Sequence, residues 1–490
     1  MRVSGEESIE PRAWAAREVR AFARATNVLI ASRTFSVRGD PPRAAALREL
    51  LSAIGARESD SPDWEFDVDA EPRWLITGDR RRSTTRRIVW AQRYMPATRA
   101  FGDHLQREKL VKGKRIGISM VLEPKTAVLA LALKGAGAIV SVFAHPDETD
   151  DAVAEYLRGK RIPVFAKSGA SADEHRGLVE GFLDAGLDFL MDDGSHVIRY
   201  AHEHRPDVFE TLIGAAEETT SGLTPLRIMD GQGALRIPVI AVNDARSKTL
   251  FDNRYGTGQS CVFAILDLVP MDLVGKTVVV VGFGNVGVGV AHHARALGAT
   301  VVVVETDAVR ALQASFEGYA VSGLIAAAAI SDILISATGV KNTITVDALR
   351  AAKPDAIVAV AGGVDQEIAL DAAVAAGGVM AAAGDRIETL TFPGDGRTRI
   401  LAEGGCINVT AAEGNPIEIM DLSFAVQLQA LRQFFESDPP PAGVYPLRDD
   451  LDRAVAAAAL GRESELGLAA TNIVDQDWNT ARFGSHPNAR

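Results

Sequence analysis

A lysine and an aspartate, Lys248 and Asp252, stand four residues apart in the polar stretch VNDARSKTLFDNRYG (242–256). In a helix this spacing places the ammonium and the carboxylate on one face, within reach of each other. One interpretation is a solvated ion pair, worth roughly 0.2–0.5 kcal/mol. The other is a proton-transfer pair that faces a cleft. The elements on either side of the stretch decide between the two.

The composition is that of a soluble protein with more than one domain. A chain of 490 residues is too long for a single core, and 47% hydrophobic with 24% charged residues is ordinary for a globular protein. The net charge of -12 disfavours a nucleic-acid partner, because phosphate binding needs a basic face. Two cysteines, Cys261 and Cys406, are too few for a disulfide framework. With no signal-peptide pattern and no apolar run long enough for a membrane, we expect a cytoplasmic protein.

The first ninety residues differ from the rest in their pattern of apolar and polar residues. They hold one helical pattern, RAAALRELLSAIGA (43–56), and a polar break, ESDSPDWEFD (58–67). The basic run GDRRRSTTRR (78–87) predicts a solvated linker rather than a binding surface.

From about residue 112, short apolar strands alternate with helical patterns. KRIGISM, AIVSVFA and IPVFA predict strands, while KTAVLALALKGAG and DDAVAEYLRGK predict helices. This order indicates a parallel sheet with helices on both faces. Ligands of such sheets lie beyond the carboxyl ends of the strands, where DFLMDD would place Asp192 and Asp193.

A glycine-rich turn begins a second α/β unit. Gly282, Gly284 and Gly287 form a GxGxxG directly after the strand pattern TVVVV and before a helix. Such glycines allow a tight turn and the close approach of a pyrophosphate to the helix N-terminus. Glu305 ends the next strand, where its carboxylate would bond a ribose 2′-hydroxyl and repel a 2′-phosphate. The context predicts an NAD site; the alternative is that the glycines only tighten the turn.

Several stretches go beyond a general dinucleotide-binding pattern. They are, in chain order, EETTSG (217–222), VNDARSKTLFDNRYG (242–256), VVGFGNVGVG (280–289), ETDAVRALQASFEGY (305–319) and LAEGGCINV (401–409). Together they resemble the adenosylhomocysteinase family, whose NAD-dependent enzymes cleave S-adenosylhomocysteine to adenosine and homocysteine. The resemblance covers about residues 92–465.

The resemblance implies an α/β fold with two doubly wound, Rossmann-like domains. We expect a substrate domain (91–255 and 413–465), an inserted NAD-binding domain (256–412), an N-terminal extension (1–90) and a C-terminal helical tail (466–490). It also implies a homo-oligomer, a dimer or tetramer, whose small-molecule substrate is a nucleoside or nucleotide. The family's C-terminal lysine and tyrosine, which reach a neighbouring subunit's NAD, have no match in DWNTARFGSHPNAR.

The family's chemistry uses NAD as a recycled catalyst. The ribose 3′-hydroxyl is oxidised to a ketone, which acidifies the hydrogen on C4′. Loss of that proton expels the 5′ substituent, water adds in its place, and the ketone is reduced again. A hydride acceptor must therefore lie beside C3′, with proton-transfer groups near the 3′-oxygen and C4′.

Carried over by position, the resemblance assigns three sets of residues. The catalytic set is Lys248, Asp252, Asp193 and Glu218. The substrate-binding set is Thr219, Glu123, Lys125, His196 and Asn415. The cofactor-binding set is Gly282, Gly284, Asn285, Val286, Gly287, Glu305, Asn253, Thr220, Ser221, Thr338, Gly339 and Asn408. A lysine flanked by carboxylates and closed off from water would shift its pKa enough to shuttle protons.

Three histidines of the family pattern are absent. The His-x-Thr-x-Glu run that meets the adenosine is replaced by MVLEPKTA, which contains Glu123 and Lys125. Gly363 and Asn415 stand at the other two positions. An unsatisfied buried polar partner of adenine would cost about 1–3 kcal/mol, whereas Lys125 suits a hydrogen-bond acceptor or an anion.

His196 stands where the family has a further carboxylate. It either replaces a lost acid–base group or is a surface or structural histidine. His202 and His204 lack a clear set of further ligands, so we expect no metal.

We predict an enzyme that applies the same ribose oxidation to a different nucleoside or nucleotide in a specialised pathway, with S-adenosylhomocysteine itself left open as a substrate. The alternative is a catalytically silent, NAD-binding relative that acts by binding a partner. The retained catalytic set favours the enzyme, and the lost histidines favour the alternative. A 2-hydroxyacid dehydrogenase would leave EETTSG unexplained.

Overall fold

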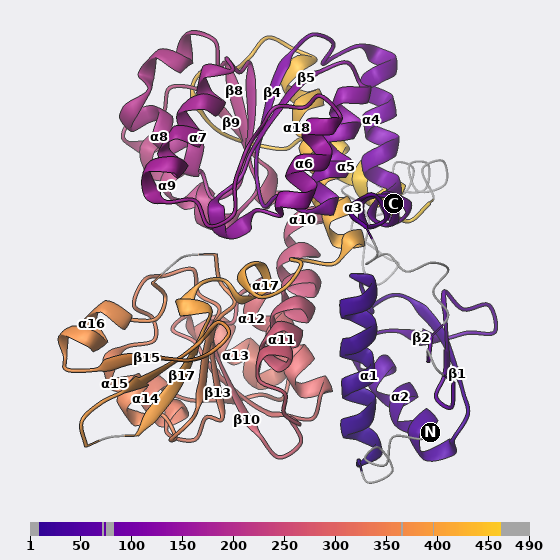
Figure 1. Ribbon diagram of the computed structural model, residues 1–490, viewed down its shortest axis with the longest axis vertical. Coiled ribbons are helices and arrows are strands. Elements are labelled where there is room, and N and C mark those ends of the chain that lie inside the picture. The colour runs from indigo at the N-terminus through magenta and orange to yellow at the C-terminus, as the bar shows by residue number, and fades with distance from the viewer. Residues whose placement is uncertain (1–8, 71–72, 75–82, 364–365, 395, 462–490) are drawn as a thin grey trace, which may run out of the picture.

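The computed structural model describes residues 9–461 except 71–72, 75–82, 364–365 and 395, so the predicted tail at 466–490 lies outside the described residues. Two lobes follow one another along the long axis, and an N-terminal module lies beside the lower lobe (Figure 1). Within the described part of the chain, no helix is long and apolar enough to cross a membrane.

The upper lobe is built on a seven-stranded sheet whose strands are all parallel, in the order β18-β9-β8-β7-β4-β5-β6. Its strands are β4 (Arg115–Ser119), β5 (Ile139–Phe143), β6 (Val164–Phe165), β7 (Phe189–Asp192), β8 (Gly214–Glu217), β9 (Pro238–Ala241) and β18 (Gly443–Pro446). Strands β7 and β8 end in Asp192 and Glu217, which are both buried. Parallel pairing therefore brings carboxylates together at one edge of the sheet.

Helices flank this sheet (Figure 1). They are α3 (Thr84–Arg93), α4 (Pro96–Glu108), α5 (Pro124–Gly135), α6 (Asp151–Gly159), α7 (Ala172–Asp184), α8 (His196–His204), α9 (Thr220–Gly231), α18 (Ile417–Phe435) and α19 (Asp449–Ala459). Helix α18 packs against β8 so closely that a β-carbon at Gly214 would lie 2.2 Å from the Phe434 ring. This contact holds the polar residues of α18 next to the carboxyl ends of the strands.

The lower lobe contains an eight-stranded sheet in the order β12-β11-β10-β13-β14-β17-β16-β15. Its strands are β10 (Thr277–Val281), β11 (Thr300–Val304), β12 (Ala320–Val321), β13 (Ile333–Ser336), β14 (Ile357–Val360), β15 (Val379–Gly384), β16 (Ile387–Thr391) and β17 (Arg397–Leu401). The pairs β15–β16 and β16–β17 are antiparallel, and the other pairs are parallel. The two sheets confirm the predicted α/β class with Rossmann-like units.

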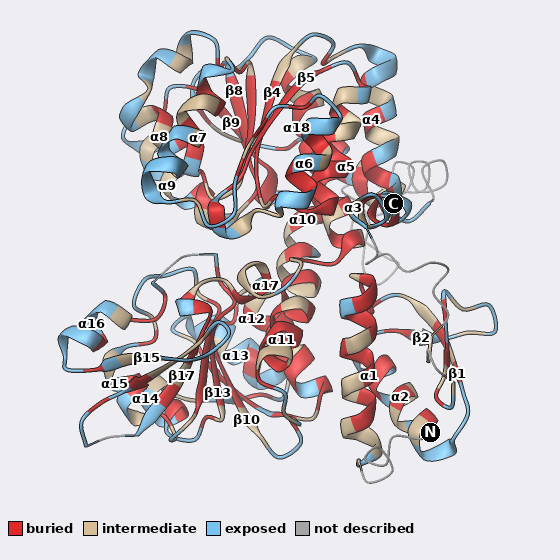
Figure 2. Ribbon diagram, viewed as in Figure 1, coloured by how far each residue is buried: buried red, intermediate tan, exposed pale blue. Residues whose placement is uncertain are grey.

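The lower-lobe helices are α11 (Thr257–Leu268), α12 (Asn285–Ala296), α13 (Ala308–Phe316), α14 (Leu324–Ala328), α15 (Val346–Ala351), α16 (Leu370–Ala375) and α17 (Ile407–Thr410). Buried residues run through both sheets and along α11, while the outer helices expose one face to solvent (Figure 2). Because α11 is buried on nearly all sides, the polar segment that precedes it is held in a fixed position.

The N-terminal module is more structured than its sequence indicated. It contains α1 (Pro11–Thr26), β1 (Thr34–Arg38), α2 (Pro41–Ile54), β2 (Arg57–Glu58) and β3 (Trp64–Asp67). Strand β3 lies inside the segment that we expected to be a polar break. Trp64 and Phe66 alternate toward the core and pack edge-on against Phe22, which explains the strand.

The module is bonded to both lobes. The Ile30 amide donates to Gln259 of α11, and Gln259 in turn donates to the Val28 carbonyl, each at 3.0 Å. The Ile417 amide, at the start of α18, donates to the Asn27 carbonyl at 2.9 Å. These bonds tie α11 of the lower lobe and α18 of the upper lobe to one support.

The prediction of a solvated linker at 78–87 is wrong for its last residues. Thr84–Arg93 forms α3, and the Arg87 guanidinium pairs with Asp150 at 2.6 Å and with Glu413 at 2.8 Å. The other part of the run, residues 78–82, lies outside the described residues. Arg87 therefore connects α3 to the loop at Glu413.

Replacing Asp421 with Ala is expected to destabilise the protein by about 2–4 kcal/mol. The buried Asp421 carboxylate of α18 accepts hydrogen bonds from the Ala97 and Thr98 amides at the start of α4, and the substitution leaves both unpaired. Urea unfolding measures the loss. The control is Asp449→Ala on the exposed first turn of α19, with a change within about 0.5 kcal/mol; equal effects of the two variants would contradict the account.

Candidate active site

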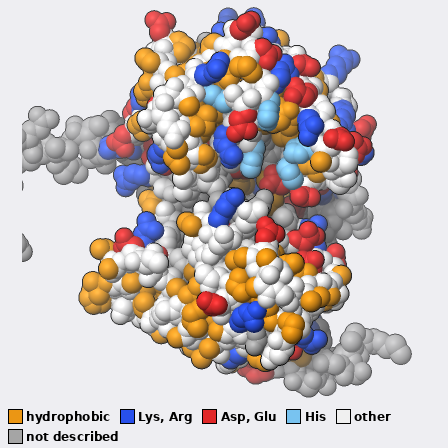
Figure 3. Space-filling view, turned by 90° about the vertical axis from the view of Figure 1, so that its left-hand side faces the viewer, with side chains coloured by type: hydrophobic (Ala, Val, Ile, Leu, Met, Phe, Trp, Pro, Cys, Tyr) orange, Lys and Arg blue, Asp and Glu red, His pale blue; other side chains and the backbone are white. Residues whose placement is uncertain are grey.

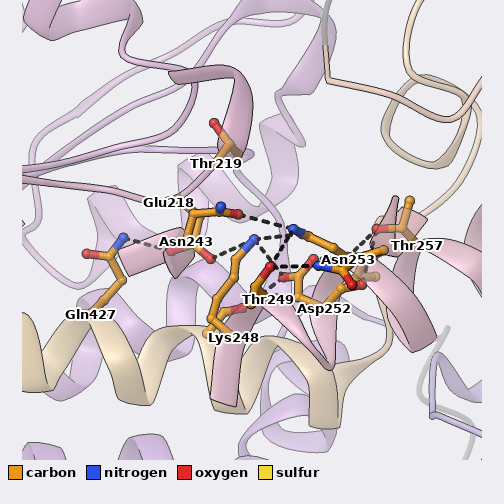
Figure 4. A network of polar contacts seen from close by, with 12 residues as sticks. Glu218, Thr219, Asn243, Lys248, Thr249, Asp252, Asn253, Thr257 and Gln427 are labelled. Carbon is orange, nitrogen blue, oxygen red and sulfur yellow. Dashed lines mark hydrogen bonds and ion pairs between the residues drawn. The ribbon is translucent and has the colours of Figure 1, made fainter. Parts of the chain in front are cut away.

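The segment between the lobes carries the lysine and the aspartate. Helix α10 (Arg246–Thr249) holds Lys248, and a π-helical turn, η5 (Asp252–Gly256), holds Asp252 before the chain continues into α11. The Lys248 Nζ lies 3.6 Å from the Asp252 Oδ2, and the two side chains are 3% and 9% exposed (Figure 4). The interpretation as a solvated ion pair is therefore wrong, because the pair is buried.

Neutral side chains fix the direction of the Asp252 carboxylate. The Asn415 amide donates to Oδ1 and the Ser423 hydroxyl donates to Oδ2, both at 2.8 Å. Asn415 thus contacts Asp252 in this structure, and its amide oxygen accepts from Ser260 and Asn408. The residue predicted to bind the base is used to hold the aspartate.

Asn253 extends the network on the other side of the lysine. The Lys248 ammonium donates to the Asn253 Oδ1 at 3.1 Å, and the Asn253 amide donates to Asn243 at 3.2 Å (Figure 4). Asn285, at the start of α12 beside Val286, donates to the Thr249 hydroxyl at 3.2 Å. This last bond joins the glycine turn of the lower lobe to the lysine segment.

Glu218 faces the lysine from the end of β8. Its Oε2 accepts from Gln427 of α18 at 2.7 Å, whereas its Oε1 is buried without a hydrogen-bond partner, 3.9 Å from the Lys248 Nζ. Burial raises the pKa of Glu218 to about 7, against the opposing effect of Lys248. An orphaned oxygen on a carboxyl that titrates near neutrality suits a hydroxyl of a bound sugar.

The pKa of Lys248 shifts in the direction opposite to the one that a shuttling lysine needs. Burial lowers it, but Asp252, Glu218 and Asp193 together outweigh burial, so the net pKa is raised. The raised pKa favours the ammonium form, and proton shuttling by Lys248 stays a prediction. Burial also raises the pKa of Asp193, and Lys248 opposes this effect.

A second carboxylate, Glu217, fixes the turn that follows β7. It accepts from the amides of Gly194 at 2.9 Å and Ser195 at 2.8 Å, and from the amide and hydroxyl of Thr219 at 2.8 Å. Gly194 and Ser195 both have left-handed backbone, with φ of 77° and 54°, which costs about 1–2 kcal/mol at the serine. Asp193 precedes this turn and His196 follows it. The Thr219 hydroxyl caps the N-terminus of α9.

Two other residues predicted to meet the base, Glu123 and Lys125, lie together at the start of α5 and form the wall predicted to meet the base. The Lys125 Nζ is 2.8 Å from Glu123 and 2.8 Å from the Glu413 carbonyl oxygen, and Lys125 is 1% exposed. Burial raises the pKa of Glu123 to about 7, an effect that Lys125 reduces. Two of the three donors of the ammonium are thus used within the protein.

The glycine turn of the lower lobe fits a dinucleotide. Gly282 has φ of 95°, and a β-carbon at Gly287 would lie 2.0 Å from the Gly282 carbonyl oxygen. A β-carbon at Gly284 would meet nothing nearer than Arg310, at 3.7 Å, so this face of the turn is open. Glu305 accepts from the Phe283 amide at 2.7 Å, which fixes its carboxylate beside the turn.

The remaining predicted cofactor residues lie at three places. Thr338 and Gly339 follow β13, and the buried Glu367 accepts from both of their amides. Thr220 and Ser221 begin α9 in the upper lobe, and a β-carbon at Gly363 of the lower lobe would lie 3.0 Å from the Ser221 hydroxyl. The lobes therefore approach each other where the family pattern has a histidine. Asn408 lies apart from the turn, bonded to Asn415 at 3.0 Å.

Sequence reasoning missed Ser423 and Gln427. Both are fully buried and lie four residues apart on α18, among buried residues that are mostly apolar. Their spacing within SFAVQLQALRQFF could have indicated a polar site, because a buried hydroxyl or amide needs a hydrogen-bond partner.

Replacing Gly287 with Ala is expected to weaken NAD binding by at least about 100-fold, because the new methyl group collides with backbone rather than with a movable side chain. Calorimetric titration with NAD measures the effect. Gly323→Ala is the matched control in the same lobe, since a β-carbon there meets nothing within 4 Å. Unchanged affinity in Gly287→Ala would contradict the assignment.

The raised pKa of Glu218 gives a pH-dependent stability. A carboxyl whose pKa is raised by folding stabilises the protein below its unfolded value, near 4.5, and that contribution is lost as the pH rises through about 7. Glu218→Gln removes this loss, so its stability relative to the wild type should increase by about 2–3 kcal/mol between pH 5 and pH 8.

Urea unfolding at both pH values, without NAD, checks this expectation. The control is Glu203→Gln on the exposed part of α8, which should change the free energy of unfolding by the same amount at both pH values. A Glu218→Gln difference that is the same at pH 5 and pH 8 would show that the carboxyl titrates normally.

Comparison with known proteins agrees with the geometry. Residues 80–208 match the family model for S-adenosyl-L-homocysteine hydrolase, and residues 253–414 match the model for its NAD binding domain. An adenosylhomocysteinase from Archaeoglobus fulgidus is 40% identical over 377 residues, which are 76% of this chain and 93% of that protein.

Two further relatives are similar to the same extent. An S-inosyl-L-homocysteine hydrolase from Methanopyrus kandleri is 39% identical over 76% of this chain and 89% of its own length. An adenosylhomocysteinase from Thermotoga maritima is 38% identical over 76% of this chain and 93% of its own length. The chain therefore belongs to the S-adenosyl-L-homocysteine hydrolase family and carries that family's NAD-binding domain.

Proposed function

We propose that the protein oxidises the ribose 3′-hydroxyl of a purine nucleoside with a carbonyl group at C6, removes the C4′ proton and releases the 5′ substituent. The observation that carries this proposal is the buried Lys125 at the wall predicted to meet the base. The overall identity does not separate the candidate bases, because relatives named for adenosyl and for inosyl substrates match at 40% and 39%.

Lys125 selects among bases by its hydrogen-bonding character. An ammonium donates three hydrogen bonds and accepts none, and Glu123 and the Glu413 carbonyl use two of them. The remaining donor needs an acceptor. Hypoxanthine presents a carbonyl oxygen at C6, whereas adenine presents an amino group, which is itself a donor. A 6-oxopurine therefore satisfies Lys125, and adenine leaves two donors facing each other.

The network around Arg87 keeps the Lys125 wall in place. Arg87 pairs with Asp150 and Glu413, and Glu413 supplies the carbonyl that holds the lysine. Burial lowers the pKa of Arg87, but pairing with Glu413 and Asp150 outweighs burial and raises it overall. These contacts hold the Lys125 ammonium in a fixed position.

The ribose chemistry follows from the carboxylates and the lysine. When bound, NAD accepts a hydride from C3′ and later returns it. The orphaned Oε1 of Glu218 would bond a ribose hydroxyl and accept its proton. Lys248, which stays an ammonium, stabilises negative charge that develops on the 3′-oxygen, and Asp193 is the carboxylate assigned to the C4′ proton.

The site argues against the catalytically silent alternative. Lys248, Glu218 and Asp252 are almost fully buried, and taking charges out of water is costly unless the geometry is exact. A protein that only binds a partner gains nothing from an orphaned carboxylate oxygen beside a buried lysine. The arrangement is therefore best explained by turnover.

Lys125→Met tests the base preference. The wild type should oxidise inosine more efficiently than adenosine by a factor of roughly 10–100, since an unpaired buried donor costs about 1–3 kcal/mol. The variant should lose most of this preference, because a thioether neither donates to the C6 carbonyl nor opposes the amino group. NADH absorbance after mixing NAD-loaded protein with each nucleoside gives both rates.

The readout is a ratio, so a loss of stability in the variant does not affect it. Lys134→Met, on the same helix but at its exposed end, should keep the wild-type preference. Faster oxidation of adenosine than of inosine by the wild type, or rapid release of homocysteine from S-adenosylhomocysteine, would overturn the proposed base.

A further inference from the structure

The N-terminal module is an addition to the family pattern. The matched family model begins at residue 80, whereas the elements of the module lie between residues 11 and 67. None of its residues belongs to the catalytic, substrate-binding or cofactor-binding sets. Its position against both lobes gives it a role of another kind (Figure 1).

The chain passes between the two lobes twice. The first crossing, residues 250–256, leads from α10 in the upper lobe to α11 in the lower lobe. The second crossing, residues 411–416, leads from α17 in the lower lobe back to α18 in the upper lobe. Segments that connect two lobes are where a hinge bends, because a few of their residues absorb the change in backbone angles.

The lobes enclose the groups that would meet substrate and cofactor. Lys248 and Lys125 are almost fully buried, and the Asn285 amide at the glycine turn donates to the Thr249 hydroxyl of α10 at 3.2 Å. On the face away from the module, the surface is drawn in between the two lobes (Figure 3). A nucleoside, or NAD at the turn, therefore enters and leaves only when the lobes separate.

A loop of the module, residues 27–33, binds the helix that follows the first crossing. Gln259 is the third residue of α11 and is buried; it accepts from the Ile30 amide and donates to the Val28 carbonyl, each at 3.0 Å. Arg20 of α1 donates to a carbonyl oxygen in the last turn of α11, which fixes α1 along that helix (Figure 1). The module is thus anchored to the lower lobe at both ends of α11.

The same loop binds the second crossing and the start of α18. The Asn27 side-chain amide donates to the Glu413 carbonyl oxygen of the crossing at 3.2 Å. Glu418 of α18 accepts from the Leu29 amide at 2.9 Å and pairs with the Arg33 guanidinium. One short loop therefore bonds to a helix of each lobe, on the side of the molecule where the crossings lie.

Two further contacts join the loop to the crossings and the site. The Glu413 carbonyl oxygen that accepts from Asn27 also accepts from the Lys125 ammonium, at 2.8 Å. Tyr255 of the first crossing packs against an apolar cluster that contains Leu29 of the loop and a residue of α18. Separation of the lobes would break or distort these contacts.

We propose that the N-terminal module is a clamp across the hinge, which limits the separation of the lobes and so slows the release of NAD. The lobes open only when the bonds of the 27–33 loop to α11 or to α18 break. Hydrogen bonds to a charged group are among the stronger ones, so those at Glu418 contribute most on the upper lobe. Retention of the cofactor does not depend on which base the protein accepts.

Gln259→Leu and Glu418→Ala test the two ends of the clamp. The first removes bonds of the loop to the lower lobe, and the second removes bonds to the upper lobe. The measurement is the exchange of bound NAD for isotopically labelled NAD, followed by mass spectrometry of the protein-bound fraction. Each variant should release NAD about 10–100-fold faster than the wild type, the factor expected for the loss of buried or charged hydrogen bonds.

The double variant separates a clamp from a general loss of stability. It should release NAD no faster than the faster single variant, because the lobes separate as soon as the weaker attachment breaks. Independent effects on stability would instead multiply the two accelerations. Small-angle X-ray scattering after removal of NAD should give each variant a larger radius of gyration than the wild type.

Glu436→Ala is the matched control at the far end of α18, where the glutamate pairs with Arg432 and Arg448. It should release NAD at the wild-type rate. Arg33→Met approaches the upper attachment from the module and leaves the Leu29 bond in place, so a smaller acceleration of about 3–10-fold is expected. This variant tests the clamp even where Glu418→Ala does not fold.

Four results would overturn the inference. They are NAD release at the wild-type rate in the variants at both ends, accelerations that multiply in the double variant, equal acceleration in Glu436→Ala, and an unchanged radius of gyration in variants that release NAD faster. Each of them leaves the proposed ribose oxidation standing, since none depends on turnover of a nucleoside.

Discussion

One buried ammonium shared among several buried carboxylates is the interaction on which the site depends. The Lys248 Nζ lies 3.6 Å from Asp252 and 3.9 Å from Glu218, and Asp193 also acts on its pKa. A single positive charge cannot neutralise all of these groups. The site therefore holds a proton near neutral pH, at a carboxyl such as Glu218, whose pKa burial raises to about 7. A carboxyl with such a pKa is what the proposed ribose oxidation needs.

The rest of the fold keeps these charges in place. Gln427 and Ser423 on α18 bind Glu218 and Asp252, and Glu217 fixes the turn that carries Asp193. The N-terminal module bonds to α11 and α18, the two helices that border the lysine segment. Carboxylates, lysine and cofactor turn thus come from separate elements that the two sheets and the module hold together.

The sequence predicted the local patterns well and the three-dimensional environment poorly. The glycine turn with Glu305, and the pair Lys248 and Asp252, follow from spacing and order. The direction in which the Lys248 pKa shifts does not follow from the sequence. It depends on how many carboxylates surround the lysine, and these come from distant parts of the chain. Ser423 and Gln427 were not recognised among the mostly apolar buried residues of α18. The N-terminal strand β3 was missed because its alternation is only four residues long.

The central claim is that the machinery for oxidation at C3′ and proton removal at C4′ is active. The most direct measurement is deuterium incorporation at C4′ of inosine incubated with the NAD-loaded protein in D₂O, followed by NMR. We predict exchange at C4′ by the wild type and its loss in Lys248→Met, in which the buried carboxylates lose their counter-charge. No exchange by the wild type, or the same exchange by both proteins, would contradict the account.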